Sequence, residues 1–438
     1  MLDIVNNIKG INDHVIYYEW YLDERAGGPT GYLANLLYGL NRIENLNSPF
    51  IVFDVREKGG TSIPAMHLKI YELLQKKIYG NRFTKYLMMN YLSKSKKKEH
   101  ENYVKFIENP DYIYCDEIMF NRIDLDKTKT IHVHTVGDAV KIRNSLNRVH
   151  NTEIKVILTC HTPEAPSDEY YKEYIERGYS KKKAKVIRDG WRVIEKRAFC
   201  EADILVFPSV ESMEPLKQTI PNFERIIEGK DIRFMETGAK TLHPTISVEE
   251  AKRKYGVEGK KVIGYIGRHN KIKGYDILKT AGKKLLSSNK NICFLIGGAI
   301  GSECKPLRNK RWIEAGWVNP ADMLQAVDIF VLPNKMTYYD LVLIEVMSMG
   351  IPIVASKTGG NISVKELTDA IYLYNNSPED MVDRIKEICD MDMKEYVDWK
   401  DKVKKAYDTY FTPVSFAERY KKMITEIYKD YNLFDAES

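Results

Sequence analysis

A single carboxylate interrupts the most apolar helix that the sequence predicts. Apart from Glu345, the side chains from Leu341 to Met347 are all aliphatic or methionine. A carboxylate among such neighbours is costly unless it meets hydrogen-bond donors, and the hydroxyls of a nucleotide ribose are suitable donors. The alternative is that Glu345 lies on the solvent-exposed side of this helix. The segment therefore predicts either a nucleotide contact or an ordinary surface position.

The start of the same helix is a candidate anion site. Tyr338, Tyr339, Asp340 and Leu341 lie where its first turn is expected. The N–H groups of a first turn have no partner within the helix and carry the positive end of the helix dipole. A phosphate or a sugar hydroxyl could dock there. Because Asp is a preferred helix cap, we expect Asp340 to cap this helix.

A glycine turn with two basic residues follows a predicted strand at 262–266. The turn runs from Gly267 to Gly274, and a helix is expected from Tyr275. Ligands of open α/β sheets bind at the carboxyl ends of strands, where this turn lies. Arg268 could hold a diphosphate as a bidentate fork and Lys273 as a point charge. The alternative is a solvated basic loop.

Three histidines lie at the ends of predicted strands in the first half. His132 and His134 share one face of their strand, and His161 follows the strand at 156–159. An HxH pair with one distant histidine and no carboxylate at ligand spacing is a poor zinc site, so we expect no metal. We expect His161 to polarise or position the reacting groups.

A glycine-rich segment at 27–32, which contains Gly28 and Gly31, follows the predicted strand at 15–18. It predicts a loop that enters a helix. The segment is not GxGxxG, and no acidic residue stands at the spacing of an NAD site, so a dinucleotide site is not predicted.

Short β-branched or aromatic runs alternate with helical segments along the whole chain. This pattern is typical of parallel sheets that are covered on both faces, and it predicts an α/β fold. The predicted strands are 15–18, 50–55, 112–114, 131–133, 156–159, 204–207, 262–266, 292–296, 316–318, 329–332 and 351–355.

A polar stretch between about 220 and 260 interrupts the series. We therefore predict an N-terminal domain over 1–240, a second domain over 241–412 and a closing helix within 413–438.

The composition agrees with two globular domains, and the charge and the cysteines bear on the kinds of partner that the protein can bind. The chain has 438 residues, 44% hydrophobic and 29% charged, with a net charge of +6. The charge suits an anionic partner, but no nucleic-acid module or concentrated basic face is present. The six cysteines form no CxxC pair. The start of the chain shows no signal peptide, and the apolar runs are strand-length, so we expect a cytoplasmic protein.

Four segments in order resemble the nucleotide-binding half of the family 4 glycosyltransferases of the GT-B fold. They are GRHNKIKGYDIL, GGAIG, GWVNPADMLQAVDIFVLPN and TYYDLVLIEVMSMGIPIVASKTGGN, from 267 to 361. The resemblance implies two Rossmann-like domains facing a cleft, with the C-terminal helix crossing back to the first. It also implies that Arg268 and Lys273 hold the diphosphate, Glu345 the ribose, and the backbone of 338–341 the donor sugar.

The family resemblance extends to the first half. Gly28 and Gly31 resemble a loop that lies near the phosphates, as the turn at Gly267 does in the second half. The ends of the predicted strands at His134 and His161 match family positions, and we expect these histidines and Glu164 on the acceptor side.

One family position differs in this chain. The family has two glutamates separated by seven residues, and Thr337 replaces the first. In the family that glutamate contacts the donor sugar. Asp340 is the nearest carboxylate that could replace it.

The resemblance implies a retaining transfer of sugar from a nucleotide sugar, UDP- more than GDP-, to a glycan, lipid-linked or protein acceptor in cell-surface glycan or glycoprotein assembly. Such a reaction needs no metal or cofactor. Two alternatives remain: a degenerate binding or scaffold subunit, for which Thr337 is the main support, and a nucleotide-sugar 2-epimerase using Glu164, Asp168 and Glu169.

Two basic stretches could contact a membrane. Residues 69–98 are rich in Tyr, Leu, Met and Lys and predict basic amphipathic helices that could rest on the inner face of an anionic membrane, while 172–188 is a second such stretch. The alternative for both is a solvated surface. The oligomeric state is not predicted.

Overall fold

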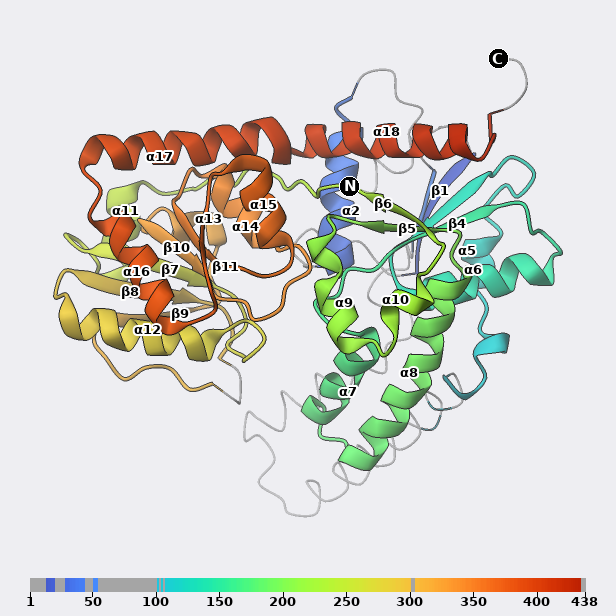
Figure 1. The fold of residues 1–438 in the computed structure, drawn as a ribbon, viewed down its shortest axis with the longest axis horizontal. Helices are drawn as coiled ribbons and strands as arrows, with labels where there is room; N and C mark the ends of the chain where they lie inside the picture. The colour runs from blue at the N-terminus through green and yellow to red at the C-terminus, as the bar shows by residue number, and fades with distance from the viewer. Residues whose placement is uncertain are drawn as a thin grey trace, which may run out of the picture.

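Two parallel β-sheets form the framework of the protein (Figure 1). The computed structural model describes residues 13–19, 28–43, 50–53, 101, 104, 107–300 and 304–434. Within these residues each sheet has six strands. The prediction of an α/β protein with two Rossmann-like sheets is confirmed.

The first sheet has the strand order β2-β1-β3-β4-β5-β6, and every neighbouring pair is parallel. Its strands are β1 (His14–Tyr18), β2 (Phe50–Phe53), β3 (Thr130–Val133), β4 (Lys155–Thr159), β5 (Ile204–Phe207) and β6 (Asp231–Phe234). Alternate residues of β1 point to opposite faces: Val15 and Tyr17 join one apolar cluster, and Ile16 and Tyr18 another.

Helices cover both faces of this sheet. The side that contains Ile16 packs against α2 (Gly28–Leu40) and α18 (Pro413–Asp430), and the other side packs against α6 (Val136–Arg148) and α8 (Lys181–Glu201). The remaining elements of the first half are short 3₁₀ turns at Pro110–Tyr112 and Glu211–Met213, with α5 (Glu117–Phe120), α7 (Pro166–Glu176), α9 (Glu214–Thr219) and α10 (Phe223–Ile226).

The second sheet has the order β12-β11-β10-β7-β8-β9, again fully parallel. Its strands are β7 (Lys261–Ile266), β8 (Ile292–Gly297), β9 (Trp312–Gly316), β10 (Ile329–Leu332), β11 (Ile353–Ser356) and β12 (Tyr372–Tyr374). On one face lie α12 (Tyr275–Ser288) and α16 (Pro378–Cys389). On the other lie α11 (Val248–Tyr255), α13 (Pro320–Leu324), α14 (Leu341–Ser348) and α17 (Met393–Ala406).

The strand predictions differ from the structure at four places. The predicted strand at 112–114 is wrong, because Pro110 opens a 3₁₀ turn and leaves Tyr112 74% exposed. The strand β6 lies in the polar stretch between about 220 and 260, where no strand is predicted, because this edge strand with partly exposed Asp231 and Arg233 has no apolar run. The strand at 316–318 is displaced to β9, and β12 was not predicted. The boundary near 240 stays a prediction; residue 240 lies between β6 and α11.

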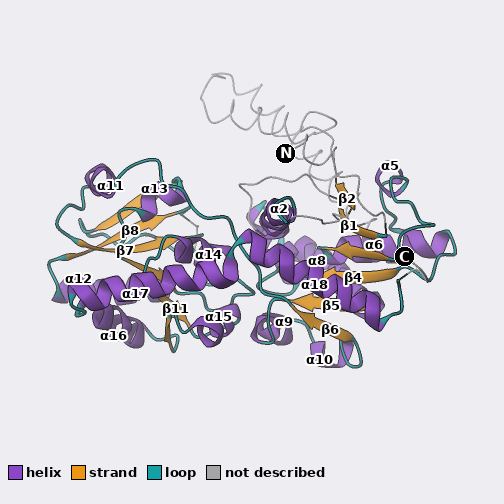
Figure 2. Ribbon diagram, turned by 90° about the horizontal axis from the view of Figure 1, so that it is seen from above, coloured by secondary structure: helices purple, strands orange, loops and turns teal. Residues whose placement is uncertain are grey.

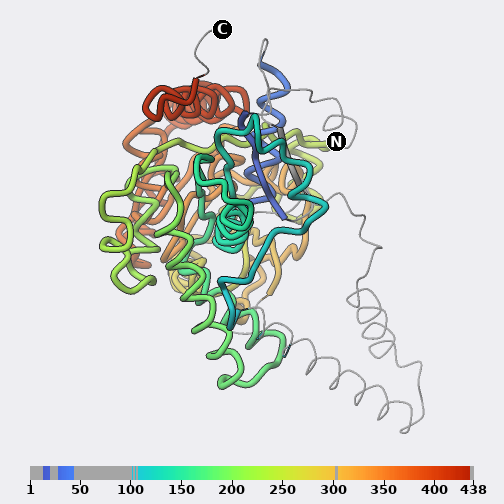
Figure 3. Tube along the Cα trace, turned by 90° about the vertical axis from the view of Figure 1, so that its right-hand side faces the viewer, coloured from blue at the N-terminus to red at the C-terminus, as the bar shows by residue number. Residues whose placement is uncertain are grey.

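The C-terminal helices link the two halves, as predicted. A π-helical turn, Tyr407–Phe411, joins α17 on the second sheet to α18, which lies across α2 of the first (Figures 1 and 2). The ring of Phe416 packs edge-on against Tyr32, with centroids 4.9 Å apart. In Figure 3 the red α18 and the blue α2 lie close together although they come from opposite ends of the chain. Long-range contacts between the ends of the chain thus complete the first core.

A buried chain of hydrogen bonds anchors α18 to the first sheet. The hydroxyl of Tyr420 is 2.8 Å from Nε2 of His14 and 2.9 Å from Nδ1 of His132. The other nitrogen of His132 is 2.8 Å from Oγ1 of Thr159. These groups are buried, so each depends on the others for hydrogen bonding.

We expect Tyr420→Phe to destabilise the protein by about 1–3 kcal/mol, because it leaves ring nitrogens of two buried histidines without a partner. Urea unfolding measures the change. Tyr410→Phe is the matched control at a partly exposed position, with a hydroxyl that has no hydrogen-bond partner in the described part of the chain. Equal stabilities of the two variants would contradict this role of Tyr420.

Stability should fall in acid. Burial lowers the pKa of His14 to about 3 and that of His132 well below its ordinary value, so both are neutral in the folded protein. An unfolded chain binds these protons below about pH 6.5, so stability is full above that pH and decreases toward about pH 3. Denaturant unfolding from pH 7 to 4 should show it. His14→Asn should flatten the slope, whereas the exposed His150→Asn should keep it.

Candidate functional site

The strand order of the second sheet reverses between β7 and β10. The chain continues from β7 to β8 on one side, whereas β10, β11 and β12 extend on the other. The loops after β7 and β10 therefore lie side by side at their carboxyl ends, the usual ligand position in open α/β sheets. The backbone N–H of Lys335 donates to the carbonyl of Ile272 at 2.8 Å and joins the two loops.

A close approach of backbones fixes this junction. Gly274 has φ +65°, and a Cβ there would lie 1.6 Å from the carbonyl oxygen of Pro333. Only glycine fits, which explains the glycine at the end of the predicted basic turn. The helix α12 begins directly after it at Tyr275, as expected.

The two basic residues of the turn take different positions. The side chain of Arg268 is exposed, and its charge acts on Glu169 of α7 in the first half. The ammonium of Lys273 is 2.8 Å from Oδ1 of Asp340, in the loop after β10. Arg268 therefore lies near the first half of the chain, and Lys273 already has an ion-pair partner.

The prediction that Asp340 caps α14 is wrong. Asp340 occupies the N-cap position, but its side chain accepts no hydrogen bond from the helix. It accepts instead from Lys273 and from Thr337 Oγ1, at 3.0 Å, and also from the amide of Asn334. These three donors hold the carboxylate away from the N–H groups of the helix start. Tyr338 and Tyr339 precede it, and Leu341 is the first residue of α14.

Glu345 is partly buried, and its carboxylate has no hydrogen-bond or ion-pair partner within the part of the chain that the structure describes. Burial raises its pKa to about 7, and the charge of Asp340 adds to this shift. The chain itself thus leaves this carboxylate without the donors that an anion in an apolar helix needs.

The loop that ends at Gly359, the residue before α15 (Gly360–Thr368), packs against Thr337. Gly359 has φ +46°, and a Cβ there would lie 1.9 Å from the carbonyl oxygen of Thr337. Its N–H donates at 3.3 Å to Oε2 of Glu214, which belongs to the first half. The loop thus holds Thr337 in place and connects the second sheet to the first.

Two histidines, His134 and His161, lie just after the carboxyl ends of β3 and β4 in the first sheet. Nδ1 of His134 is 3.0 Å from Nε2 of His161, and the rings are stacked. The ring of His161 lies 4.5 Å from that of Tyr32 and 6.1 Å from that of Tyr338, between centroids. The carboxyl ends of both sheets therefore meet here, and residues from both halves surround His161.

Several buried polar atoms in this cluster have no partner among the described residues. They are Nε2 of His134, which is 1% exposed, and the hydroxyls of Tyr32, Tyr338 and Tyr339. Burial lowers the pKa of His161 to about 3 and that of His134 well below its ordinary value, so both rings are neutral at pH 7. Such groups can donate to or accept from a hydroxyl-bearing ligand.

Glu164, predicted on the acceptor side, lies in the loop before α7, and Asp168 and Glu169, the further candidates for a 2-epimerase, lie on α7. Glu164 is buried and forms an ion pair with Lys172. Burial raises the pKa of Glu169 to about 7, with a further rise from Glu164 and an opposing effect of Arg268. Asp168 lies 3.8–3.9 Å from two arginines of α8.

The glycines of the first half lie differently from the prediction. Gly28 is the first residue of α2 and Gly31 is a buried position in its first turn, so neither belongs to a loop within the described residues. Gly267 lies where expected, at the end of β7, where its carbonyl oxygen is in close contact with Gly298.

Sequence reasoning missed the residues that complete the site through tertiary contacts. Asn334 holds Asp340, Tyr32 packs on His161, and Glu214 reaches Gly359. They lie in separate segments of the chain, and only the fold brings them to the site, so their contacts cannot be identified from the sequence. The stretch 69–98 lies outside the described residues, and its membrane contact stays a prediction.

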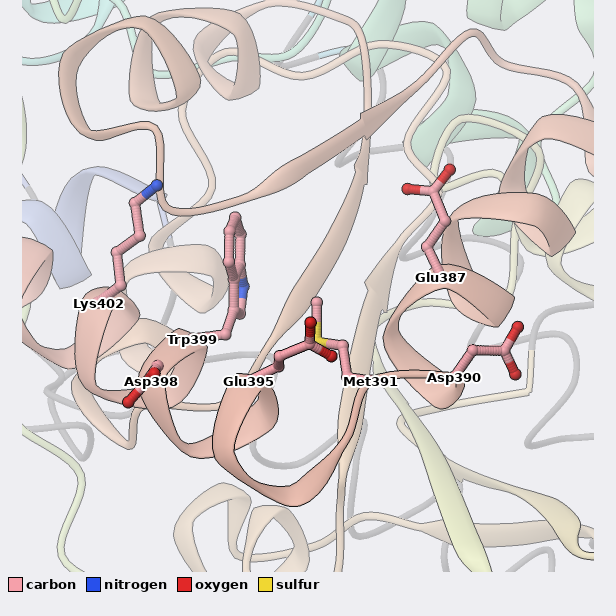
Figure 4. Close-up of a pocket in the computed structure, with 7 residues that line it drawn as sticks. All are labelled: Glu387, Asp390, Met391, Glu395, Asp398, Trp399 and Lys402. Atoms are coloured by element: carbon pink, nitrogen blue, oxygen red, sulfur yellow. The ribbon is translucent and has the colours of Figure 1, made fainter.

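The described residues hold no group of three or more His, Cys, Asp or Glu that could bind a metal, and none of their helices is long and apolar enough to cross a membrane. The second half has a pocket of about 590 Å³. Its lining residues are drawn in Figure 4: Glu387, Asp390, Met391, Glu395, Asp398, Trp399 and Lys402. Its mainly acidic lining does not suit a diphosphate, and none of the predicted site residues lies in it.

The second half of the chain is similar in sequence to known proteins. Residues 260–391 match the family described as Glycosyl transferases group 1. The D-inositol 3-phosphate glycosyltransferases of Corynebacterium aurimucosum and Corynebacterium jeikeium are 26% and 27% identical over 226 and 232 residues. These matches cover 46% of this chain and 52% and 53% of those proteins, so the chain spans about half the length of the curated relatives it matches.

Solved structures match the whole arrangement. Sucrose-phosphate synthase from Thermosynechococcus elongatus has a TM-score of 0.59 at 14% identity, over 95% of this chain and 100% of that one. Anabaena HepE, in complex with UDP and glucose, has a TM-score of 0.57 at 12% identity, over 94% and 99%. At these identities the likeness shows the fold. The protein therefore has the two-domain GT-B fold, and its residues 260–391 match the Glycosyl transferases group 1 family.

Proposed function

We propose that the protein is a glycosyltransferase that moves a sugar from a nucleoside diphosphate sugar to a hydroxyl-bearing acceptor. One observation carries the proposal. Arg268, Lys273, the uncapped start of α14 and the partnerless Glu345 lie together at the strand-order reversal of a domain that matches a glycosyltransferase family. Positive charge for a diphosphate thus lies beside a carboxylate that needs hydroxyl donors.

Each group has a part in this reaction. Arg268 and Lys273 bind the diphosphate and, with the helix dipole of α14, stabilise the charge that develops on it as the sugar bond breaks. Glu345 accepts hydrogen bonds from the ribose. Neutral His161, oriented by His134, positions the donor sugar and the acceptor, with Glu164 on the acceptor side. No step requires a metal or another cofactor.

The finer assignments belong to the same proposal. We infer a retaining transfer, as in family 4, to a glycan, lipid-linked or protein acceptor in cell-surface glycan or glycoprotein assembly. Because the Anabaena protein of the same fold is described with UDP, uridine nucleotides are the first donors to test. The named activity of the corynebacterial relatives makes inositol 3-phosphate a reasonable acceptor to include.

A nucleotide-sugar 2-epimerase is the second candidate. Glu169, with a pKa of about 7, lies within electrostatic reach of Arg268 and could serve as an acid or base at neutral pH. A changed free sugar nucleotide without added acceptor would identify this activity, whereas slow donor hydrolysis would favour a transferase.

Donor binding tests the proposal directly. UDP-, GDP-, ADP- and dTDP-sugars should be screened for thermal stabilisation, because a ligand that binds only the folded state raises Tm. We expect a shift with one nucleotide that is lost in Glu345→Ala. The exposed Glu366→Ala on α15 (Gly360–Thr368) is the matched control and should keep the shift. No shift with any donor would favour a degenerate binding subunit.

Turnover should depend on both basic residues of the turn. Arg268→Ala and Lys273→Ala should each lower kcat/KM by about 100-fold or more, because each removes charge that stabilises the leaving diphosphate. Lys271→Ala, an exposed lysine of the same turn, should stay near the wild-type rate. Circular dichroism checks that all three variants fold. Wild-type rates in the first two would contradict the site.

A further inference from the structure

Two buried hydrogen-bond donors hold one oxygen of the Asp340 carboxylate. Oδ2 accepts from the hydroxyl of Thr337 at 3.0 Å and from the amide of Asn334, and these two residues are 2% and 0% exposed. Among the described residues, Oδ1 accepts a hydrogen bond only from Lys273, at 2.8 Å. The carboxylate is therefore held by residues of its own loop, whereas its lysine partner reaches it from another loop.

This arrangement places a negative charge where the proposed donor phosphates lie. Lys273 is the residue that we assign to the diphosphate, and it is the only cation paired with Asp340 among the described residues. A diphosphate that takes Lys273 leaves the charge of Asp340 uncompensated at short range. Phosphate oxygens carry no hydrogen-bond donors, so their interaction with Asp340 is repulsive.

A donor sugar, in contrast to the phosphates, interacts favourably with the same carboxylate. Each carboxylate oxygen can accept about two hydrogen bonds, and Oδ1 has accepted one. A sugar hydroxyl can therefore donate to Oδ1 while Thr337 and Asn334 stay in place. A free nucleoside diphosphate has no such hydroxyl there, and its terminal phosphate carries an additional negative charge.

We propose that Asp340 is a specificity-determining residue that favours the nucleotide sugar over the free nucleoside diphosphate. Asp340 competes with the diphosphate for Lys273, which weakens the binding of any nucleoside diphosphate. A hydrogen bond from a sugar hydroxyl to Asp340 offsets this weakening, and only the nucleotide sugar can form it. The inference rests on the proposed function and adds the residue that separates donor from product. It also gives Thr337 a role, as a donor that fixes Asp340.

Isothermal titration calorimetry with UDP and UDP-glucose, and with GDP and GDP-mannose as a second pair, tests the inference. Asp340→Asn removes the charge but keeps the size and a good N-cap residue. We expect it to bind the free diphosphate about tenfold more tightly and the nucleotide sugar no more tightly, so that the ratio of the two Kd values changes about tenfold. If this variant does not fold, the titrations are repeated with Asp340→Ser, which is also uncharged.

Asp369→Asn is the matched control. Asp369 forms an ion pair of the same length, 2.8 Å, with Lys402 at the other end of α15, and Asn tolerates its left-handed backbone. It should leave both Kd values unchanged. Equal changes for both ligands in Asp340→Asn, or loss of binding, would overturn the inference and leave the proposed function standing. Failure of the wild-type protein to bind any of the four ligands would overturn the proposed function and the inference with it.

Discussion

The reversal of strand order between β7 and β10 decides where charged loops can meet in this protein. The loops that follow these strands leave the sheet at one edge, and the contact of Gly274 with Pro333 holds them together. Lys273 and Asp340 become neighbours although 66 residues separate them in the sequence. The uncapped start of α14 and Glu345 lie in the same place for the same topological reason.

The position of this edge depends in turn on contacts between the two halves. The helix α18 returns from the second sheet and completes the core of the first, where Phe416 and Tyr420 meet Tyr32 and two histidines. At the carboxyl ends of the sheets, the ring of Tyr338 from the second half lies near that of His161, and Glu214 accepts a hydrogen bond from the N–H of Gly359. These contacts bring the carboxyl ends of both sheets together, so that groups from both domains can act on one ligand.

Burial sets the charge state of the groups at this junction. It keeps His134 and His161 neutral and raises the pKa values of Glu169 and Glu345 to about 7. The exposed Arg268 stays available. A ligand with phosphates at one end and hydroxyls at the other would satisfy both kinds of group, and this complementarity is the physical basis of the proposed function.

The sequence by itself determined the α/β class, the buried strands and the glycine turn with Arg268 and Lys273, because apolar runs and glycine turns are local properties. It also identified Glu345 as a carboxylate in an apolar helix. It did not predict β6, a polar edge strand whose pairing comes from its neighbour, or the 3₁₀ turn at 110–112. Only the tertiary structure decided the partner of Asp340, because three donors from two loops outcompete the helix start that Asp alone would cap.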